Sequence, residues 1–156
     1  MATTFDPAVI EARSALVELL RGRRVVVLTG AGCSTESGIP DYRGPTAPQP
    51  PRKPMTYQEF VGSDAARVRY WARSAVGWRR IATARPNPAH YALARLEAGG
   101  VVRGIITQNV DGLHHAAGSR RVVELHGALA QVRCLGCGWR QARAEFQERL
   151  VALNAA

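Results

Sequence analysis

Residues 25–44 read VVVLTGAGCSTESGIPDYRG, an apolar run followed by a glycine-rich turn. The first four residues, Val25–Leu28, are apolar and mostly β-branched, which is typical of a strand buried on both faces of a parallel sheet. The chain then passes directly into Gly30–Gly32. Glycines here let the backbone approach a pyrophosphate closely, and their N–H groups can bind phosphate oxygens. This stretch indicates an α/β fold with a ligand site at the carboxyl end of a strand.

The turn lacks the fingerprint of dinucleotide-dependent dehydrogenases. A G-x-G-x-x-G motif would place glycine at position 35, where Thr35 stands. No acidic residue that could bind a ribose follows about 20 residues later, because residues 49–53 read QPPRK. Hydride-transfer chemistry is therefore disfavoured, and a tight turn without a ligand is the alternative for the glycine pair alone.

Helices and strands alternate on both sides of this stretch. Asp6 and Pro7 predict the start of a helix that Gly22 can end. Five of the nine prolines fall within residues 45–54, which indicates a loop. The remaining expected elements are, in chain order, a helix over 56–82, a helix over 89–98 capped by Asn87-Pro88, strands over 101–107 and 122–125, and a helix over 143–153. This order predicts a parallel sheet.

Composition and charge narrow the function classes. The 156 residues are 46% hydrophobic and 21% charged, which suits a globular domain rather than a disordered chain or a disulfide miniprotein. No apolar run approaches the ~18 residues of a membrane span, and the N-terminus shows no secretory signal pattern. Three cysteines without such a signal favour a reducing compartment. We expect a cytoplasmic location, or the mitochondrial matrix in a eukaryote, and no membrane partner.

Two further polar blocks follow the later strands: TQNVDGLH at residues 107–114 and ELHG at residues 124–127. Together with GAGCSTESGIPDYRG at residues 30–44, they resemble the motifs of the sirtuins, the NAD-dependent protein-lysine deacylases, in order and spacing. The resemblance covers essentially the whole chain, and residues 69–73, RYWAR, look most similar to the class II branch. It implies NAD as cofactor, one structural Zn²⁺, and acylated-lysine proteins as substrates.

The same resemblance implies how the chain is divided. Residues 1–44 and 84–128 would form an incomplete Rossmann-like NAD-binding domain, and residues 45–83 a cofactor loop with a small helical module. Residues 129–156 would begin a zinc ribbon whose second cysteine pair lies further downstream in the family. We therefore expect an incomplete sirtuin that is inactive and binds zinc poorly by itself.

Residue roles carry over position by position. The backbone of Gly30–Gly32 would cradle the pyrophosphate of NAD, Arg43 would pair with a phosphate, and Tyr42, where the family more often has Phe, would cover the nicotinamide. The full set of expected cofactor-binding residues is Gly30, Ala31, Gly32, Ser34, Asp41, Tyr42, Arg43, Gln108, Asn109, Asp111 and His126.

Three of these residues are also expected to be catalytic. Asn109 and Asp111 would orient the nicotinamide carboxamide and a water, while Gln108 would meet the ribose. His126, at the end of a strand, would act as the general base on a ribose hydroxyl, since an imidazole accepts protons near neutral pH. Without the resemblance these would be turn formers and a structural histidine. The same activated ribose allows protein mono-ADP-ribosylation as an alternative outcome.

The Cys134-x-x-Cys137 pair supplies half of a tetrahedral zinc site. A redox dithiol is the alternative, but Gly136 and Gly138 indicate a knuckle turn. Cys33 stands where many relatives carry Ile and is interpreted as a small hydrophobic residue, not as a metal ligand. His114 and His115 are interpreted as structural or rim residues.

Two hypotheses stay open. Tyr70 and Arg73 lie three residues apart in a predicted helix, so they share a face and could bind the carboxylate of an acidic acyl group; core packing of Tyr70 beside Trp71 and an ion pair at Arg73 are the alternative. The net charge of +9, from 20 Arg and Lys53 against 12 acids, would also suit a basic zinc-ribbon module that binds nucleic acid. That hypothesis leaves the residue 108–111 block and the glycine turn unexplained, and aromatic residues are not interleaved with the basic ones, so nucleic acid is not the expected partner.

Overall fold

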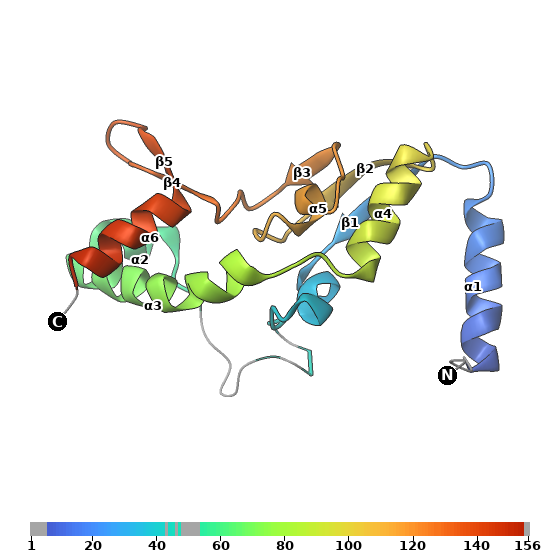
Figure 1. The fold of residues 1–156 in the computed structure, drawn as a ribbon, viewed down its shortest axis with the longest axis horizontal. Helices are drawn as coiled ribbons and strands as arrows, with labels where there is room; N and C mark the ends of the chain where they lie inside the picture. Colours follow the sequence, from blue (N-terminus) through green and yellow to red (C-terminus); the bar gives the residue numbers. More distant parts are fainter. Residues whose placement is uncertain (1–5, 43, 46, 48–53, 155–156) are drawn as a thin grey trace.

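The computed structural model describes residues 6–42, 44–45, 47 and 54–154. Its elements are, in chain order, α1 (Pro7–Leu20), β1 (Val25–Thr29), the 3-10 helix η1 (Ala31–Ser37), α2 (Tyr57–Gly62), α3 (Asp64–Thr83), α4 (Pro88–Ala98), β2 (Val102–Thr107), α5 (Leu113–Ala116), β3 (Val122–Glu124), β4 (Gln131–Arg133), β5 (Arg140–Ala142) and α6 (Arg143–Ala152). Figure 1 shows an elongated molecule, with α1 at one end, the main sheet in the middle, and α2, α3 and α6 gathered at the other end.

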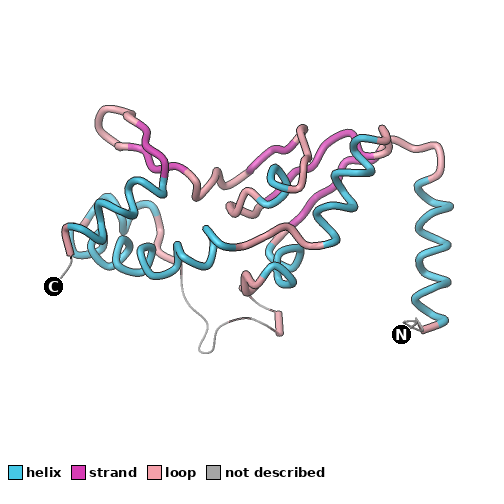
Figure 2. The backbone as a smooth tube through the Cα atoms, viewed as in Figure 1, coloured by secondary structure: helices cyan, strands magenta, loops and turns pink. Residues whose placement is uncertain are grey.

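The main sheet is parallel, with strand order β1-β2-β3. Thr29 of β1 pairs with Thr107 of β2, and Thr107 pairs with Glu124 of β3, so the three strands end at the same edge. Figure 2 shows these strands side by side in the middle of the molecule. The predicted α/β class with a parallel sheet is confirmed. Polar segments that follow these strands are therefore brought together at one edge.

Side-chain caps begin two of the predicted helices. The Asp6 side chain accepts a hydrogen bond from the Ala8 backbone N–H at the start of α1. The Asn87 side chain accepts hydrogen bonds from the backbone N–H groups of Ala89 and His90 at the start of α4. These bonds satisfy N–H groups that have no partner inside the helix. Both starts agree with the sequence prediction.

Burial of β1 differs from the sequence expectation. Val25 and Val27 are half-buried, but Val26 is 61% exposed and Leu28 is 66% exposed. The described elements leave the face that carries Val26 and Leu28 open, so the expected burial on both faces is wrong for this structure. In the central strand, by contrast, the side chain of Ile105 is fully buried, at 0% exposure.

The helical end contains two helices where the sequence predicted one over residues 56–82. Ser63 interrupts it with an extended backbone (φ −150°), and its hydroxyl accepts a hydrogen bond from the Ala66 N–H to begin α3. A serine hydroxyl competes for backbone N–H groups in this way, so it favours a helix start over a helix interior. The guanidinium of the buried Arg143 lies over the rings of both Trp71 and Trp78, so these two residues share a face of α3.

A short antiparallel hairpin of β4 and β5 precedes α6, and its turn contains Cys134 and Cys137. None of the helices in the described ranges has the length and hydropathy needed to cross a membrane.

Candidate functional site

The carboxyl edge of the main sheet extends one residue beyond the strands. The Gln108 backbone N–H donates to the Thr29 carbonyl at 3.0 Å, and the Leu125 N–H donates to the Thr107 carbonyl at 2.9 Å. This pairing fixes the starts of three segments: the glycine turn, the block 108–111, and the pair Leu125-His126. All the residues with an expected catalytic role lie on these segments.

Asn109 connects the glycine turn to the block that follows β2. It is 8% exposed, and its Nδ2 donates to the Gly30 carbonyl at 3.0 Å and to Ser34 Oγ at 3.1 Å. Ser34 Oγ in turn donates to Asp111 Oδ2 at 2.8 Å. The other carboxylate oxygen of Asp111 accepts the Leu113 N–H at 2.9 Å. Four sequence-predicted positions thus form one continuous hydrogen-bonded network.

His126 lies at the same edge, exposed, with one ring nitrogen fixed. Its Nδ1 is 3.0 Å from the carbonyl oxygen of Gln108. A carbonyl can only accept, so Nδ1 carries the hydrogen and donates it. In the neutral imidazole the lone pair is therefore on Nε2, which is available to accept a proton.

The glycine turn leaves room in front of its backbone. A Cβ added at Gly30 or Gly32 would meet no other atom within 4 Å. Gly38 ends η1 in the left-handed region (φ 81°), which a side chain disfavours. The turn therefore presents open backbone beside the Asn109 network.

Further predicted site residues lie after η1, at positions 41–43, and on α3, at positions 70 and 73. Tyr42 is 72% exposed, Asp41 is half-buried, and Arg43 lies outside the described residues. Tyr70 makes an edge contact with Phe60, with ring centroids 5.0 Å apart, and a second with Trp71 at 5.2 Å.

Arg73 is exposed on the same helix, α3. The contact of Tyr70 with Trp71 is the packing that the alternative interpretation of Tyr70 predicts.

The thiols of Cys134 and Cys137 are exposed in the β4–β5 turn. Hydrogen bonds from the backbone N–H groups of Cys137 and Gly136 lower the pKa of the Cys134 thiol. Such N–H···S bonds favour a thiolate, the form that binds metals. The turn thus fits two of the four ligands of a structural zinc.

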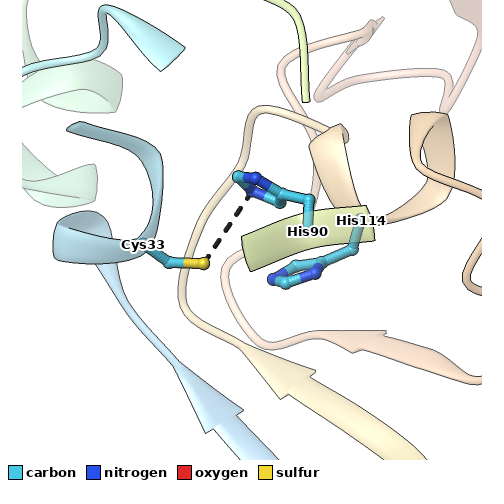
Figure 3. A group of neighbouring side chains, drawn as sticks. All are labelled: Cys33, His90 and His114. Atoms are coloured by element: carbon cyan, nitrogen blue, oxygen red, sulfur yellow. Dashed lines mark hydrogen bonds between the residues drawn. The ribbon is translucent and has the colours of Figure 1, made fainter. Parts of the chain in front are cut away.

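Sequence reasoning did not foresee a group formed by Cys33, His90 and His114 (Figure 3). Their potential ligand atoms all lie within 4.8 Å of one another. Burial raises the pKa of the Cys33 thiol, and the Asp111 carboxylate raises it further. Burial lowers the pKa of both imidazoles. The three residues are far apart in sequence, and the available signal was a histidine at the third helical position after Asn87-Pro88.

Comparisons with known proteins agree with this geometry. Residues 30–156 match the sequence model of the Sir2 family. The chain is 60% identical over 139 residues to NAD-dependent protein deacetylase 1 of Mycobacterium avium (strain 104), covering 89% of this chain and 49% of that protein. It is 51% identical over 150 residues to the NAD-dependent protein deacetylase of Bordetella pertussis (strain Tohama I / ATCC BAA-589 / NCTC 13251), covering 93% of this chain and 55% of that protein.

Solved structures are similar as well. A structure titled "Sir2-p53 peptide-NAD+" superposes with a TM-score of 0.75 at 35% identity, over 87% of this chain and 54% of that one. A second structure, titled "Structural Basis for the Mechanism and Regulation of Sir2 Enzymes", superposes with a TM-score of 0.73 at 39% identity, over 94% of this chain and 58% of that one. This chain spans about half the length of the curated relatives it matches. The resemblance drawn from the three motifs is confirmed, and the chain belongs to the Sir2 family.

Proposed function

We propose that the protein containing this chain is an NAD-dependent protein-lysine deacylase that releases nicotinamide and O-acyl-ADP-ribose. The observation that supports this most strongly is the arrangement of His126 beside the Ser34–Asn109–Asp111 network at one sheet edge. The relatives named above are called NAD-dependent protein deacetylases, and one similar structure carries NAD⁺ and a peptide in its title.

The residues at this edge fit NAD as a ligand. Open backbone at Gly30 and Gly32 leaves space for a pyrophosphate, which backbone N–H groups can bind. Asn109 and Asp111 are fixed by hydrogen bonds to the same turn, so they can orient the nicotinamide end relative to the phosphates. When bound, NAD supplies the glycosidic bond whose cleavage activates the ribose.

His126 then acts as a general base through Nε2. The Gln108 carbonyl holds Nδ1–H, so the ring orientation and the tautomer are set before any ligand arrives. A proton taken from a ribose hydroxyl enters at Nε2. The resulting imidazolium keeps its hydrogen bond to the Gln108 carbonyl.

Cys134 and Cys137 would hold a zinc ion with two further ligands from outside the described residues. Two thiolates provide half of a tetrahedral shell. The ion would stabilise the β4–β5 turn and take no part in the chemistry.

The substrates of this activity would be acylated lysines on proteins, and the reaction would take place in the cytoplasm of a bacterium. Tyr70 and Arg73 would recognise a carboxylate at the far end of the acyl group, because Arg73 is exposed on the helix that carries Tyr70. The edge contacts of Tyr70 with Phe60 and Trp71 fix its ring without occupying its hydroxyl.

The test compares the complete gene product with its His126→Ala variant on an acetyl-lysine peptide. Loss of a general base should lower the deacylation rate about 10²–10⁴-fold. NAD affinity, measured by calorimetry, should change by less than about tenfold, because His126 bonds the backbone and not the Asn109 network. His115→Ala, which alters a half-exposed histidine on α5, is the matched control.

A near wild-type rate for His126→Ala would refute the assignment of the base. Transfer of labelled ADP-ribose onto protein, without deacylation, would instead favour the mono-ADP-ribosyltransferase alternative.

A further inference from the structure

We propose that Cys33, His90 and His114 form a binding site for a single Zn²⁺ ion, distinct from the Cys134/Cys137 pair (Figure 3). The three residues come from η1, α4 and α5, so the site joins three segments under the glycine turn. His90 is 0% exposed and His114 is 2% exposed. Thiolate sulfur and imidazole nitrogen are the ligand atoms that zinc prefers in proteins.

The ring of His90 is oriented as a metal ligand would be. Asn87 Nδ2 donates to the Cys33 carbonyl at 2.8 Å, which turns the Asn87 oxygen toward His90. This oxygen lies 2.9 Å from His90 Nδ1, and the Asn87 backbone N–H donates to the same nitrogen at 3.3 Å, so Nδ1 has an acceptor and a donor beside it. In the tautomer that donates from Nδ1 to the Asn87 oxygen, the lone pair of Nε2 faces Cys33 Sγ at 3.9 Å, and metal binding would select this tautomer. A hydrogen bond to the second ring nitrogen is the usual support of a metal-bound histidine.

His114 has one partner for two ring nitrogens. Nε2 lies 2.9 Å from Thr29 Oγ1, and Nδ1 is buried with no hydrogen-bond partner in the described part of the chain. A buried polar atom left unpaired costs free energy. A metal ion on one nitrogen, with Thr29 on the other, gives both nitrogens a partner.

The dimensions require a modest contraction. With Zn–S near 2.3 Å and Zn–N near 2.0–2.1 Å, tetrahedral ligands lie roughly 3.3–3.6 Å apart. Cys33 Sγ and His90 Nε2 need to approach by about 0.3 Å, and the widest pair of the group by roughly 1.3 Å. Small rotations of the three side chains about their χ angles bring the ligand atoms together on this scale.

The charges also match. Binding breaks the S–H bond of Cys33 and releases its proton to solvent, so the ion gains one thiolate and two neutral imidazoles. Asp111 supplies the second negative charge nearby, since it bonds Ser34, next to Cys33, and the N–H of Leu113, next to His114. Thiolate and carboxylate together balance a divalent cation, and the fourth position is left for water.

The test is a Co²⁺ titration of the complete gene product, loaded beforehand with zinc at its cysteine ribbon. We expect one further equivalent of Co²⁺, a thiolate-to-cobalt charge-transfer band, and displacement by Zn²⁺. Cys33→Ala should remove the band, and His114→Asn should weaken binding at least about tenfold. His115→Asn alters the neighbouring, half-exposed histidine and should leave binding unchanged.

A second measurement needs no variant. Zn²⁺ should slow the alkylation of Cys33 by iodoacetamide at least about tenfold, followed at that residue by mass spectrometry. An unchanged alkylation rate, no further equivalent of Co²⁺, or a band that persists in folded Cys33→Ala protein would each overturn the proposal. A band that disappears in Cys134→Ser/Cys137→Ser protein would do the same, because it would place the added cobalt at the ribbon.

Discussion

Replacing Ser34 by alanine should destabilise the protein through two lost hydrogen bonds. Ser34 is 1% exposed, donates to the Asp111 carboxylate at 2.8 Å and accepts from Asn109 Nδ2 at 3.1 Å. A hydrogen bond to a charged group contributes about 1.5–3 kcal/mol, and a neutral one about 0.5–1.5 kcal/mol. Asn109 keeps its bond to the Gly30 carbonyl, so the neutral contribution falls at the lower end. We expect the free energy of unfolding to fall by about 2–3.5 kcal/mol.

Guanidinium denaturation of the complete gene product measures this loss, with the m-value expected to stay constant. Thr35→Ala is the matched control, because Thr35 is a half-buried residue of the same turn whose hydroxyl makes a local hydrogen bond to the Gly32 carbonyl, at 3.0 Å. That variant should lose less than about 1 kcal/mol. If Ser34→Ala lowered the free energy of unfolding no more than Thr35→Ala, the network would not hold the glycine turn in place.

Three further predictions concern other parts of the structure. Asn87→Ala removes the cap of α4 and the bond to the Cys33 carbonyl, so the free energy of unfolding should fall by about 2–3 kcal/mol in the same denaturation assay; a loss under about 0.5 kcal/mol would contradict the cap assignment. Arg143→Ala should lower the free energy of unfolding by about 2–4 kcal/mol in the same assay, because the packing between Trp71 and Trp78 is lost. Arg143→Met fills the same space without a buried charge and should lower it by less than about 1.5 kcal/mol. Equal losses would mean that the charge matters more than the packing. Cys134→Ser should lower zinc content, measured by atomic emission in the complete gene product, and an unchanged content would remove Cys134 from the zinc ligands.

Local signals in the sequence were sufficient for most of the fold. Asp6-Pro7 and Asn87-Pro88 mark helix starts because a side-chain oxygen and a proline suit the first turn whatever packs around it. The β-branched run at Val25–Leu28 likewise becomes a strand of a parallel sheet. The polar blocks then meet at one edge because parallel strands end together.

Features that depend on packing were not predictable in the same way. Exposure of Val26 and Leu28 depends on what covers the sheet, which a run of apolar residues does not specify. The break at Ser63 depends on whether its hydroxyl bonds the backbone ahead of it. His90 stands at the third position of the helix that Asn87 caps, but this position does not specify that it lies beside Cys33, 57 residues earlier.

The division of the chain into residues 1–44 with 84–128, 45–83 and 129–156 stays a prediction. So do the individual roles of the cofactor-binding residues. The grouping of Ser34, Asn109, Asp111 and His126 at one sheet edge agrees with the roles predicted for these four residues, and His126→Ala tests one of them.

For the general-base role proposed for His126, its hydrogen bond to Gln108 has a consequence for how the proton leaves the ring. The backbone carbonyl occupies Nδ1, so a proton that enters at Nε2 must also leave from Nε2. The partner at Nδ1 is a backbone carbonyl, which can only accept a hydrogen bond and cannot carry a proton away. Since His126 is exposed, bulk water can reach the ring once products depart. The base should therefore be reset between turnovers by direct exchange with solvent, without a relay of protein side chains.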